Sequence, residues 1–338
     1  MTTHSSITAI QPKSPAEFER FLSVPDGIHF EPDTLAESKA NEHWLLEDAT
    51  GARARCSLWW HATPTYQGDR VGLIGHYAAP DTLAEAVLRL ACDRLRLAGC
   101  ALAVGPMDGS TYHRYRLVTE SSDEPTFLLE PHNPASWPAH FTDNGFAAMA
   151  QYYSAVQDDL DAEDPRVPVI EQLMEAEGVR LRPLVNTEFE RELRYIYPVV
   201  AAGFAQSLLA SPISEDEFVA MYSQLQVLID PQLVQIAETD ERAVGFLLVL
   251  PDWRQHQRGE AIDTVIAKTM AVLPEYSQQG LGILLCARAQ EAASNLGYSR
   301  AIHALMHEDN FSRRLSAHFH GRIIRRYTLY MKPLEGTA

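Results

Sequence analysis

The sequence is short of basic residues, cysteines and long apolar runs, and each shortage excludes a class of protein. It has 28 Lys and Arg against 45 Asp and Glu, a net charge of −17. A surface of that sign repels phosphate backbones, so no nucleic-acid or anionic-membrane partner is expected, whereas cationic amines would be attracted. The four cysteines include no Cys-x-x-Cys pair, which argues against a zinc ribbon or a redox dithiol.

The N-terminus lacks the basic and apolar regions of a signal peptide. No apolar run approaches the roughly 18 residues of a transmembrane helix. With cysteines that read as small buried hydrophobes, these features predict a cytoplasmic protein.

What is present is an ordinary globular composition, with 46% hydrophobic residues in a chain of 338. At roughly 100–200 residues per domain, this length predicts two domains. The acidic, proline-closed stretch 158–168 indicates the connection between them. We therefore predict an N-terminal domain at 1–160, a linker at 161–179 and a C-terminal domain at 180–338.

The two halves predict the same order of elements, with a hairpin before a central strand, a long helix and a further strand. The central strands, helices and following strands are expected at 70–77, 82–99 and 100–106, and at 264–274, 280–297 and 299–306. A short helix at 310–321 and a strand at 322–334 end the chain. This pattern predicts an α/β (α+β) fold in which each half is a mixed, mostly antiparallel, twisted sheet flanked by helices. It also suggests an internal duplication.

The most informative segment is AVLPEYSQQGLGILL, residues 271–285. A strand ends at Pro274, a polar loop follows, and Gly280-Leu281-Gly282 opens a long helix. The first turn of a helix has unpaired N–H groups and a partial positive charge, so it binds anions, and glycines let a phosphate come close. A tight packing turn has the same appearance. The third glycine of a Rossmann fingerprint and the Lys-Ser/Thr pair of a P-loop are both missing.

In this context the segment resembles the central motif of the GNAT superfamily of acetyl-CoA-dependent N-acetyltransferases. That motif is Val-x-Pro-x-Tyr followed by Arg/Gln-x-x-Gly-x-Gly/Ala. Residues 272–276 and 277–282 follow it, with Ser277 in place of the usual Arg or Gln. The second family motif, an Asn that starts a helix eleven residues before a Gly, is matched by Asn310 and Gly321. The resemblance covers residues 180–334.

The resemblance implies a site for acetyl-CoA or another acyl-CoA in the C-terminal half. Family members hold the CoA pyrophosphate on the loop, which here implies Ser277, Gln278, Gln279, Gly280, Leu281 and Gly282. The preceding strand would pair with the pantetheine arm through Met270, Ala271, Val272 and Leu273. Asn310 would hydrogen-bond the pantetheine, and Arg313 lies on the same short helix within reach of a CoA phosphate.

The N-terminal half resembles a degenerate copy of the same family. Its equivalent loop, residues 77–84, has no glycine. Pro80 lacks an N–H donor, and the Asp81 carboxylate would cap the helix and repel a pyrophosphate. We therefore predict no CoA site in residues 1–160, which would serve as a scaffold or as one wall of an acceptor pocket. The plan is similar to that of bacterial double-GNAT proteins.

By resemblance, the activity is transfer of an acetyl or other acyl group to an amine of a small molecule or peptide, in a ternary complex. Ala317 occupies the position of the Tyr that protonates the leaving thiolate in many family members. A non-catalytic CoA- or metabolite-binding protein of the same fold is therefore the alternative. The acceptor, the acyl length and the oligomeric state cannot be read from the sequence, which leaves a homodimer open.

Acid–base chemistry needs groups that titrate near neutrality, and the strand HALMHED supplies His303, His307 and Glu308. Strand alternation puts 303, 305 and 307 on one face, either toward the site or toward the core. His307 with His318 and His320 fits no strong zinc motif. No metal site is therefore predicted.

Overall fold

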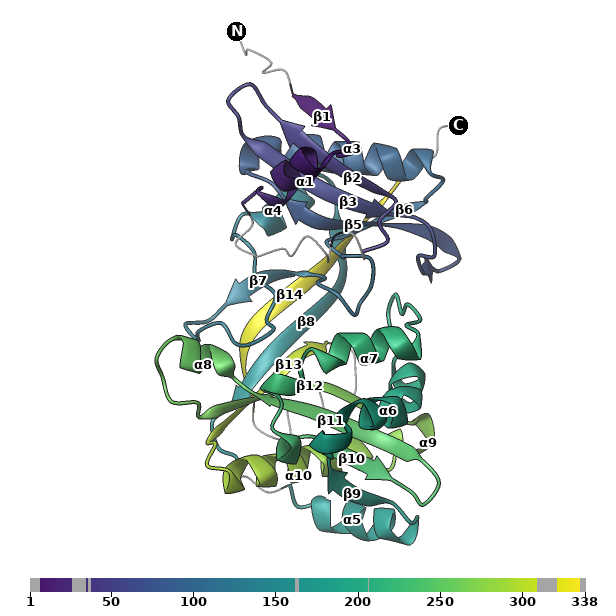
Figure 1. Cartoon of the computed structure of the whole chain (residues 1–338), viewed down its shortest axis with the longest axis vertical. Coiled ribbons are helices and arrows are strands. Elements are labelled where there is room, and N and C mark those ends of the chain that lie inside the picture. The colour runs from purple at the N-terminus through teal and green to yellow at the C-terminus, as the bar shows by residue number, and fades with distance from the viewer. Residues whose placement is uncertain are drawn as a thin grey trace. The chain divides into compact units, whose positions relative to one another are not determined.

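The computed structural model describes residues 7–25, 35, 38–161, 164–205, 207–308 and 321–334. The chain divides into two compact units (Figure 1). Unit 1 comprises residues 1–120, 131–151 and 326–338, and unit 2 comprises residues 121–130 and 152–325.

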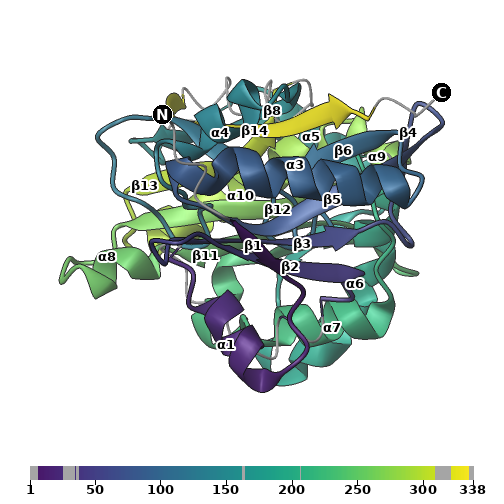
Figure 2. The same ribbon diagram turned by 90° about the horizontal axis from the view of Figure 1, so that it is seen from above.

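Unit 1 is a mixed sheet with helices. Its strand order is β1 (Thr8–Ile10), β2 (Glu42–Glu47), β3 (Arg53–Trp59), β5 (Asp69–Ala78), β6 (Leu102–Gly105) and β14 (Arg322–Pro333). Strands β5 and β6 are parallel, and α3 (Asp81–Leu97), which is labelled in Figure 2, connects them. The apolar side chains of α3 pack into the core. The smaller elements are β4 (Thr65–Tyr66), β7 (Leu117–Ser121), α1 (Pro15–Leu22) and α4 (Trp137–Asp143).

Unit 2 repeats this plan with its own set of strands. Its strand order is β8 (Ala147–Gln157), β13 (Arg300–His307), β12 (Thr264–Val272), β11 (Ala243–Pro251), β10 (Gln235–Glu238) and β9 (Arg180–Pro183). Strands β12 and β13 are parallel and are joined by α10 (Leu281–Asn295). The other helices are α5 (Val167–Ala176), α6 (Phe189–Phe204), α7 (Glu215–Ser223), α8 (Trp253–Gln257) and α9 (Pro274–Ser277), with 3-10 turns at Asn186–Glu188, Gln226–Leu228 and Pro231–Leu233.

These sheets confirm the predicted fold class, a mixed and mostly antiparallel sheet flanked by helices in each half. The four cysteines are buried thiols, as expected. The predicted short helix at 310–321 lies outside the described residues, except for Gly321. Within the described parts of the chain, none of the helices combines the length and the apolar character that crossing a membrane requires.

The predicted boundary near residue 160 differs from the division that the structure shows. Each unit takes one strand from the other half of the sequence. The C-terminal strand β14 pairs with β6 in unit 1, and the end of β8 pairs with β13 in unit 2. Residues 152–160 and 326–338 therefore belong to the units opposite to those predicted. A composition shift cannot reveal such an exchange, because strand pairing is not local in sequence.

The segment 161–179 is not a linker. It contains α5, whose Ile170 and Met174 are buried in the core of unit 2. Two of the acidic residues that suggested a solvated connection make ion pairs, Asp158 with Arg300 at 2.8 Å and Asp164 with Arg166. Asp158, Asp159 and Asp161 are exposed, as expected, but Asp164 is buried beside Arg166.

Candidate functional site

Strands β12 and β13 pair only over a short length. Their parallel register runs from Thr264–Arg300 to Ala267–His303, and among the described residues it goes no further. Beyond that point β12 continues alongside β11, whereas β13 continues alongside β8. The two central strands therefore part at Ala267 and His303, and within the described parts of the chain the backbone of Thr269–Val272 has no strand partner on the β13 side.

A β-bulge lies next to the parting point in each strand. On β12, Leu248 pairs with Thr269 and Val249 pairs with Ala267, so the register skips Lys268. On β13, the register with β8 shifts between His303 and Met306, and Leu305 has the left-handed φ of 60°. Because a bulge bends its strand and increases the local twist, the pair of bulges accounts for the divergence.

The loop after β12 begins with the one-turn helix α9 and ends at Gly280, whose φ of 91° is left-handed. A Cβ at Gly280 would lie 2.8 Å from the Ile170 side chain of α5. The sequence left open whether this glycine serves the close approach of a phosphate or a tight packing turn. The structure shows reasons of the second kind, namely the backbone conformation and the contact with α5.

Three amides at the start of α10 are available to an anion. The amides of Ile283 and Leu284 donate to the Gly280 carbonyl, at 2.8 and 3.2 Å, and that of Gln279 donates to the Tyr276 carbonyl at 3.2 Å. Gln278 N–H also points to the Tyr276 carbonyl. The amides of Gly280, Leu281 and Gly282 have no acceptor among the residues that the structure describes. Of the five amides of residues 278–282, those of Gln278 and Gln279 are thus used inside the loop.

The side chains of the loop hold its shape. Ser277 Oγ donates to the Pro274 carbonyl at 2.9 Å, and Gln279 Nε2 donates to the Glu275 carbonyl at 3.1 Å. Gln279 Oε1 is buried with no hydrogen-bond partner in the described structure. The Glu275 carboxylate is paired with Arg242 at 2.9 Å, which offsets the one acidic charge of the loop.

The predicted pantetheine strand contacts helices α6 and α7. Met270, Ala271 and Val272 form the end of β12, and Leu273 precedes α9. A Cβ at Gly203 of α6 would lie 3.0 Å from Ala271 Cβ, so the helix packs tightly here. Burial raises the pKa of Tyr222 of α7, and the nearby Thr269 of β12 offsets part of that rise. Nothing in the sequence singles out this phenol, because its position near β12 depends on tertiary packing alone.

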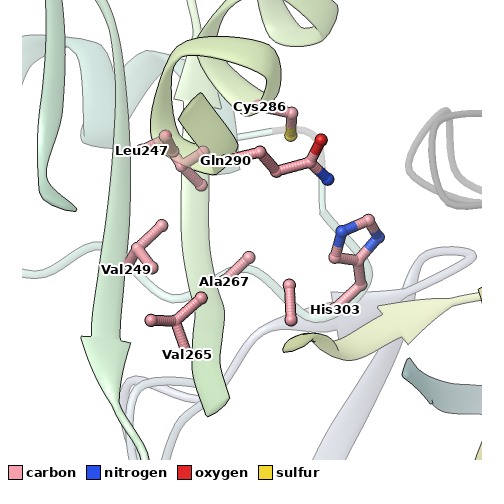
Figure 3. A pocket seen from close by; sticks show the side chains of 9 residues that line it. Leu247, Val249, Val265, Ala267, Cys286, Gln290 and His303 are labelled. Carbon is pink, nitrogen blue, oxygen red and sulfur yellow. The ribbon is translucent and has the colours of Figure 1, made fainter. Parts of the chain in front are cut away.

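His303 lies on the core face of the sheet, one of the two faces that strand alternation left open. Its side chain borders a cavity of about 10 Å³ between the sheet and α10 (Figure 3). The cavity is mainly apolar, and its other polar residue is Gln290, whose amide donates to Gln157 Oε1 at 2.6 Å. Only 6% of His303 is exposed, and burial lowers its pKa to about 4. This imidazole is therefore neutral at pH 7 and is a core histidine.

His307 and Glu308 lie at the end of β13, and both are half-buried. The Tyr152 ring of β8 contacts the His307 ring edge to face, with 4.9 Å between centroids. Asn310 and Arg313 lie outside the described residues, as do Ala317, His318 and His320. Among the described residues, no group of three or more His, Cys, Asp or Glu side chains could hold a metal ion.

The equivalent loop of unit 1 has no turn like α9, and α3 starts directly after Pro80. Asp81 does not cap this helix, contrary to the sequence prediction. Instead its carboxylate accepts a 2.8 Å hydrogen bond from His140 Nε2, which lowers the pKa of Asp81. The other His140 nitrogen bonds the Tyr77 hydroxyl at 2.9 Å. The Asp81 carboxylate still lies in the first helical turn, where it would repel a pyrophosphate. The prediction that this loop binds no CoA therefore stays a prediction.

Comparisons with known proteins agree with the geometry of unit 2. Residues 204–321 match the sequence profile of the Acetyltransferase (GNAT) family. The bacterial ceramide synthase of Caulobacter vibrioides is 26% identical over 278 residues, which cover 74% of this chain and 71% of that protein. Protein YghO of Escherichia coli is 23% identical over 160 residues, which cover 47% of this chain and 40% of that protein.

Solved structures share the fold over nearly the whole chain. An N-acetyltransferase of this family from Sphaerobacter thermophilus matches with a TM-score of 0.51 and 14% identity, over 98% of this chain and 97% of that one. A tandem GNAT protein from the clavulanic acid biosynthesis pathway matches with a TM-score of 0.50 and 10% identity, over 98% and 100%. At these identities the likeness shows the fold alone, and it confirms the predicted tandem arrangement.

Proposed function

We propose that this chain, whose residues 204–321 match the acetyltransferase (GNAT) family, is an acyl-CoA-dependent N-acyltransferase. The observation that carries the proposal is the row of available amides at Gly280, Leu281 and Gly282, at the start of α10. Helix N-termini of this kind bind phosphate groups. The row follows β12 after the short loop that contains α9, and β13 does not pair with the end of β12 among the residues that the structure describes.

In this proposal, the amides of Gly280, Leu281 and Gly282 bind the CoA pyrophosphate. Ser277, Gln278 and Gln279 form the turn that presents them, and Gln279 Oε1 is a buried acceptor without a donor among the described residues. The backbone of Met270–Leu273 would receive the pantetheine arm, and Asn310 and Arg313 keep the roles that the family resemblance implies. The acyl-CoA supplies an activated thioester with a good leaving group.

The transfer forms a carbon–nitrogen bond from the amine to the acyl carbonyl carbon and breaks the carbon–sulfur bond. An alkylammonium ion has a pKa near ~10.4, so the acceptor must first lose a proton, and the leaving thiolate must be stabilised or protonated. We propose His307 and Glu308 for these proton transfers, because both lie at the end of β13 beyond the parting point. We assign no catalytic role to His303, because its ring is buried in the core.

The acceptor class follows from the ceramide synthase similarity, which extends over 74% of this chain. A ceramide is an N-acylated long-chain amino alcohol. We therefore propose an amphiphilic primary amine as the acceptor and test acyl chains of different length. The alternative is a non-catalytic CoA-binding protein, which is favoured by Ala317 and by the use of the Ser277 hydroxyl inside the loop.

A matched pair of variants at Ser277 tests the site. Ser277→Asp places a carboxylate beside the three amides, whereas Ser277→Asn has the same shape without the charge. We expect Ser277→Asp to weaken CoA binding at least tenfold relative to Ser277→Asn, about 1.4 kcal/mol. Calorimetric titration with CoA gives the affinity. Equal affinities in the two variants would place the pyrophosphate elsewhere.

Turnover separates the enzyme from the binding protein. Free thiol is measured with acetyl-CoA and a long-chain acyl-CoA, against long-chain amino alcohols, polyamines and peptide amines. Thiol release that depends on an amine supports the transferase. CoA binding without thiol release from any pair supports the non-catalytic alternative.

A further inference from the structure

We infer that Ser154 of β8 is a positioning residue for acyl transfer, which it supports by holding the bulge of β13 open. This inference rests on the proposed function and adds to it a residue from the N-terminal half of the sequence. The residues involved are Ser154 and Tyr152 on β8, and Leu305 and His307 on β13. All of them lie in unit 2.

A side-chain hydrogen bond between Ser154 and Leu305 takes the place of a backbone hydrogen bond where the β8–β13 ladder is interrupted. Ala155 pairs with His303 and Tyr153 pairs with Met306, so two residues of β13 stand opposite Ser154. The Leu305 amide donates to Ser154 Oγ at 2.9 Å, and no part of Ser154 is exposed. A left-handed φ is costly for leucine and persists only where its surroundings hold it. The hydrogen bond from the Leu305 amide to Ser154 stabilises this backbone conformation.

The position of the bulge ties it to the parting of the central strands. His303 is the last residue of β13 that pairs with β12, and the bulge begins at the next residue. On the other side of the gap, the skipped residue Lys268 directly follows Ala267, the last β12 residue that pairs with β13. Without the bulge, β13 could continue in a regular ladder toward β12, and the inner edge of Thr269–Val272 would be covered. Ser154 therefore helps to keep the proposed pantetheine strand accessible.

The bulge also sets the face on which His307 lies. Strand side chains alternate, so the removal of one extra residue would turn every later side chain to the opposite face. With the bulge in place, His307 pairs with Tyr152 and its ring contacts the Tyr152 ring. Strand β8 thus fixes both the backbone at Leu305 and the orientation of a proposed proton carrier.

The experiment compares Ser154→Ala with Ser154→Thr, which keeps the hydroxyl, and uses Ser294→Ala as the matched control. Ser294 lies near the end of α10, where its hydroxyl donates to the Asp161 carboxylate at an exposed site. We measure kcat and KM for acyl-CoA, CoA affinity, and hydrogen exchange of the Leu305 amide in the full chain. Should Ser154→Ala not fold, Ser154→Cys keeps the volume with a weaker acceptor and replaces it.

We expect Ser154→Ala to lower kcat/KM for acyl-CoA about tenfold and to speed exchange at Leu305, with Ser154→Thr close to wild type and Ser294→Ala unchanged. The inference is overturned if Ser154→Ala exchanges faster at Leu305 but keeps wild-type kcat and KM, or if Leu305 exchange does not change. Loss of activity in both the Ala and Thr variants would also overturn it, since the hydroxyl would then not be the cause. A wild-type protein that neither binds CoA nor releases thiol would instead refute the proposed function.

Discussion

At the scale of single residues, burial decides which ionisable groups take part in chemistry. His303 and His76 are both buried, and burial lowers the pKa of each to about 4. Both values lie below the ~6.5 of a free histidine, so between these limits the unfolded chain binds protons that the folded chain does not. The contribution of these two histidines to the free energy of unfolding is therefore fully present above pH 6.5 and is lost as the pH falls from 6.5 toward 4.

The first residue-scale prediction follows from that sign. Below pH 4 the free energy of unfolding is lower than at pH 7 by roughly 3 kcal/mol for each of these histidines, which is the equivalent of the pKa difference between the unfolded and the folded chain. The variant His303→Gln should lose less stability than wild type between pH 7 and pH 4.5, whereas the exposed control His256→Gln should follow wild type. Urea unfolding at several pH values measures this. A parallel pH dependence in wild type and His303→Gln would show that His303 is not a buried neutral histidine.

His303 also shows how far residue-level prediction from sequence goes. The residue types and the strand were predicted, and the alternation correctly restricted the side chain to two faces. The choice between the faces depends on α10, which is brought over the sheet only in the fold. For the same reason Ser154 and Tyr222 escaped notice, since nothing in their neighbourhoods along the sequence distinguishes them from ordinary strand and helix residues.

At the scale of elements, local signals predicted most helices and strands well, and α5 is the instructive exception. The helices predicted at 82–99 and 280–297 correspond to α3 and α10, and Gly99 and Gly297, which follow them, have left-handed φ values of 80° and 90°. The charged stretch around α5 instead pointed to a linker. Its function in the fold is to cover Gly280 with Ile170, a contact that links it to the candidate loop.

This contact yields the element-scale prediction. Ile170→Ala removes the side chain that packs on Gly280, and a truncation of this kind costs about 2–5 kcal/mol at a buried site. Val169 on the same helix is 69% exposed, so Val169→Ala serves as the control and should leave stability near wild type. We expect Ile170→Ala also to weaken CoA binding, because the turn that presents the amides loses its support. Unchanged stability and CoA affinity in Ile170→Ala would show that α5 does not support the loop.

At the scale of the whole molecule, the exchange of β8 and β14 makes each unit depend on the other half of the sequence. The sequence predicted two domains of the same family and their order of elements, because those follow from local patterns. It could not predict the exchange, since β8 would pair equally well by its composition with a strand of its own half. Under the proposed function both halves of the sequence contribute to the site, because the predicted CoA loop lies in the C-terminal half whereas Ser154 and Tyr152 come from the N-terminal half.

The whole-molecule prediction concerns truncation at the boundary that the sequence suggests. A fragment of residues 180–338 lacks both β8 and α5, so β13 would present an unpaired edge and Gly280 would lose its cover. Unpaired edge strands promote aggregation. We expect this fragment to show no cooperative unfolding and no thermal shift with CoA, whereas a fragment of residues 147–338 regains at least part of both. Thermal unfolding with and without millimolar CoA measures these properties, because a ligand that binds only the native state raises its melting temperature. A fragment of residues 180–338 that unfolds cooperatively and responds to CoA like the full chain would show that β8 is dispensable. It would also contradict the division of the site between the two halves.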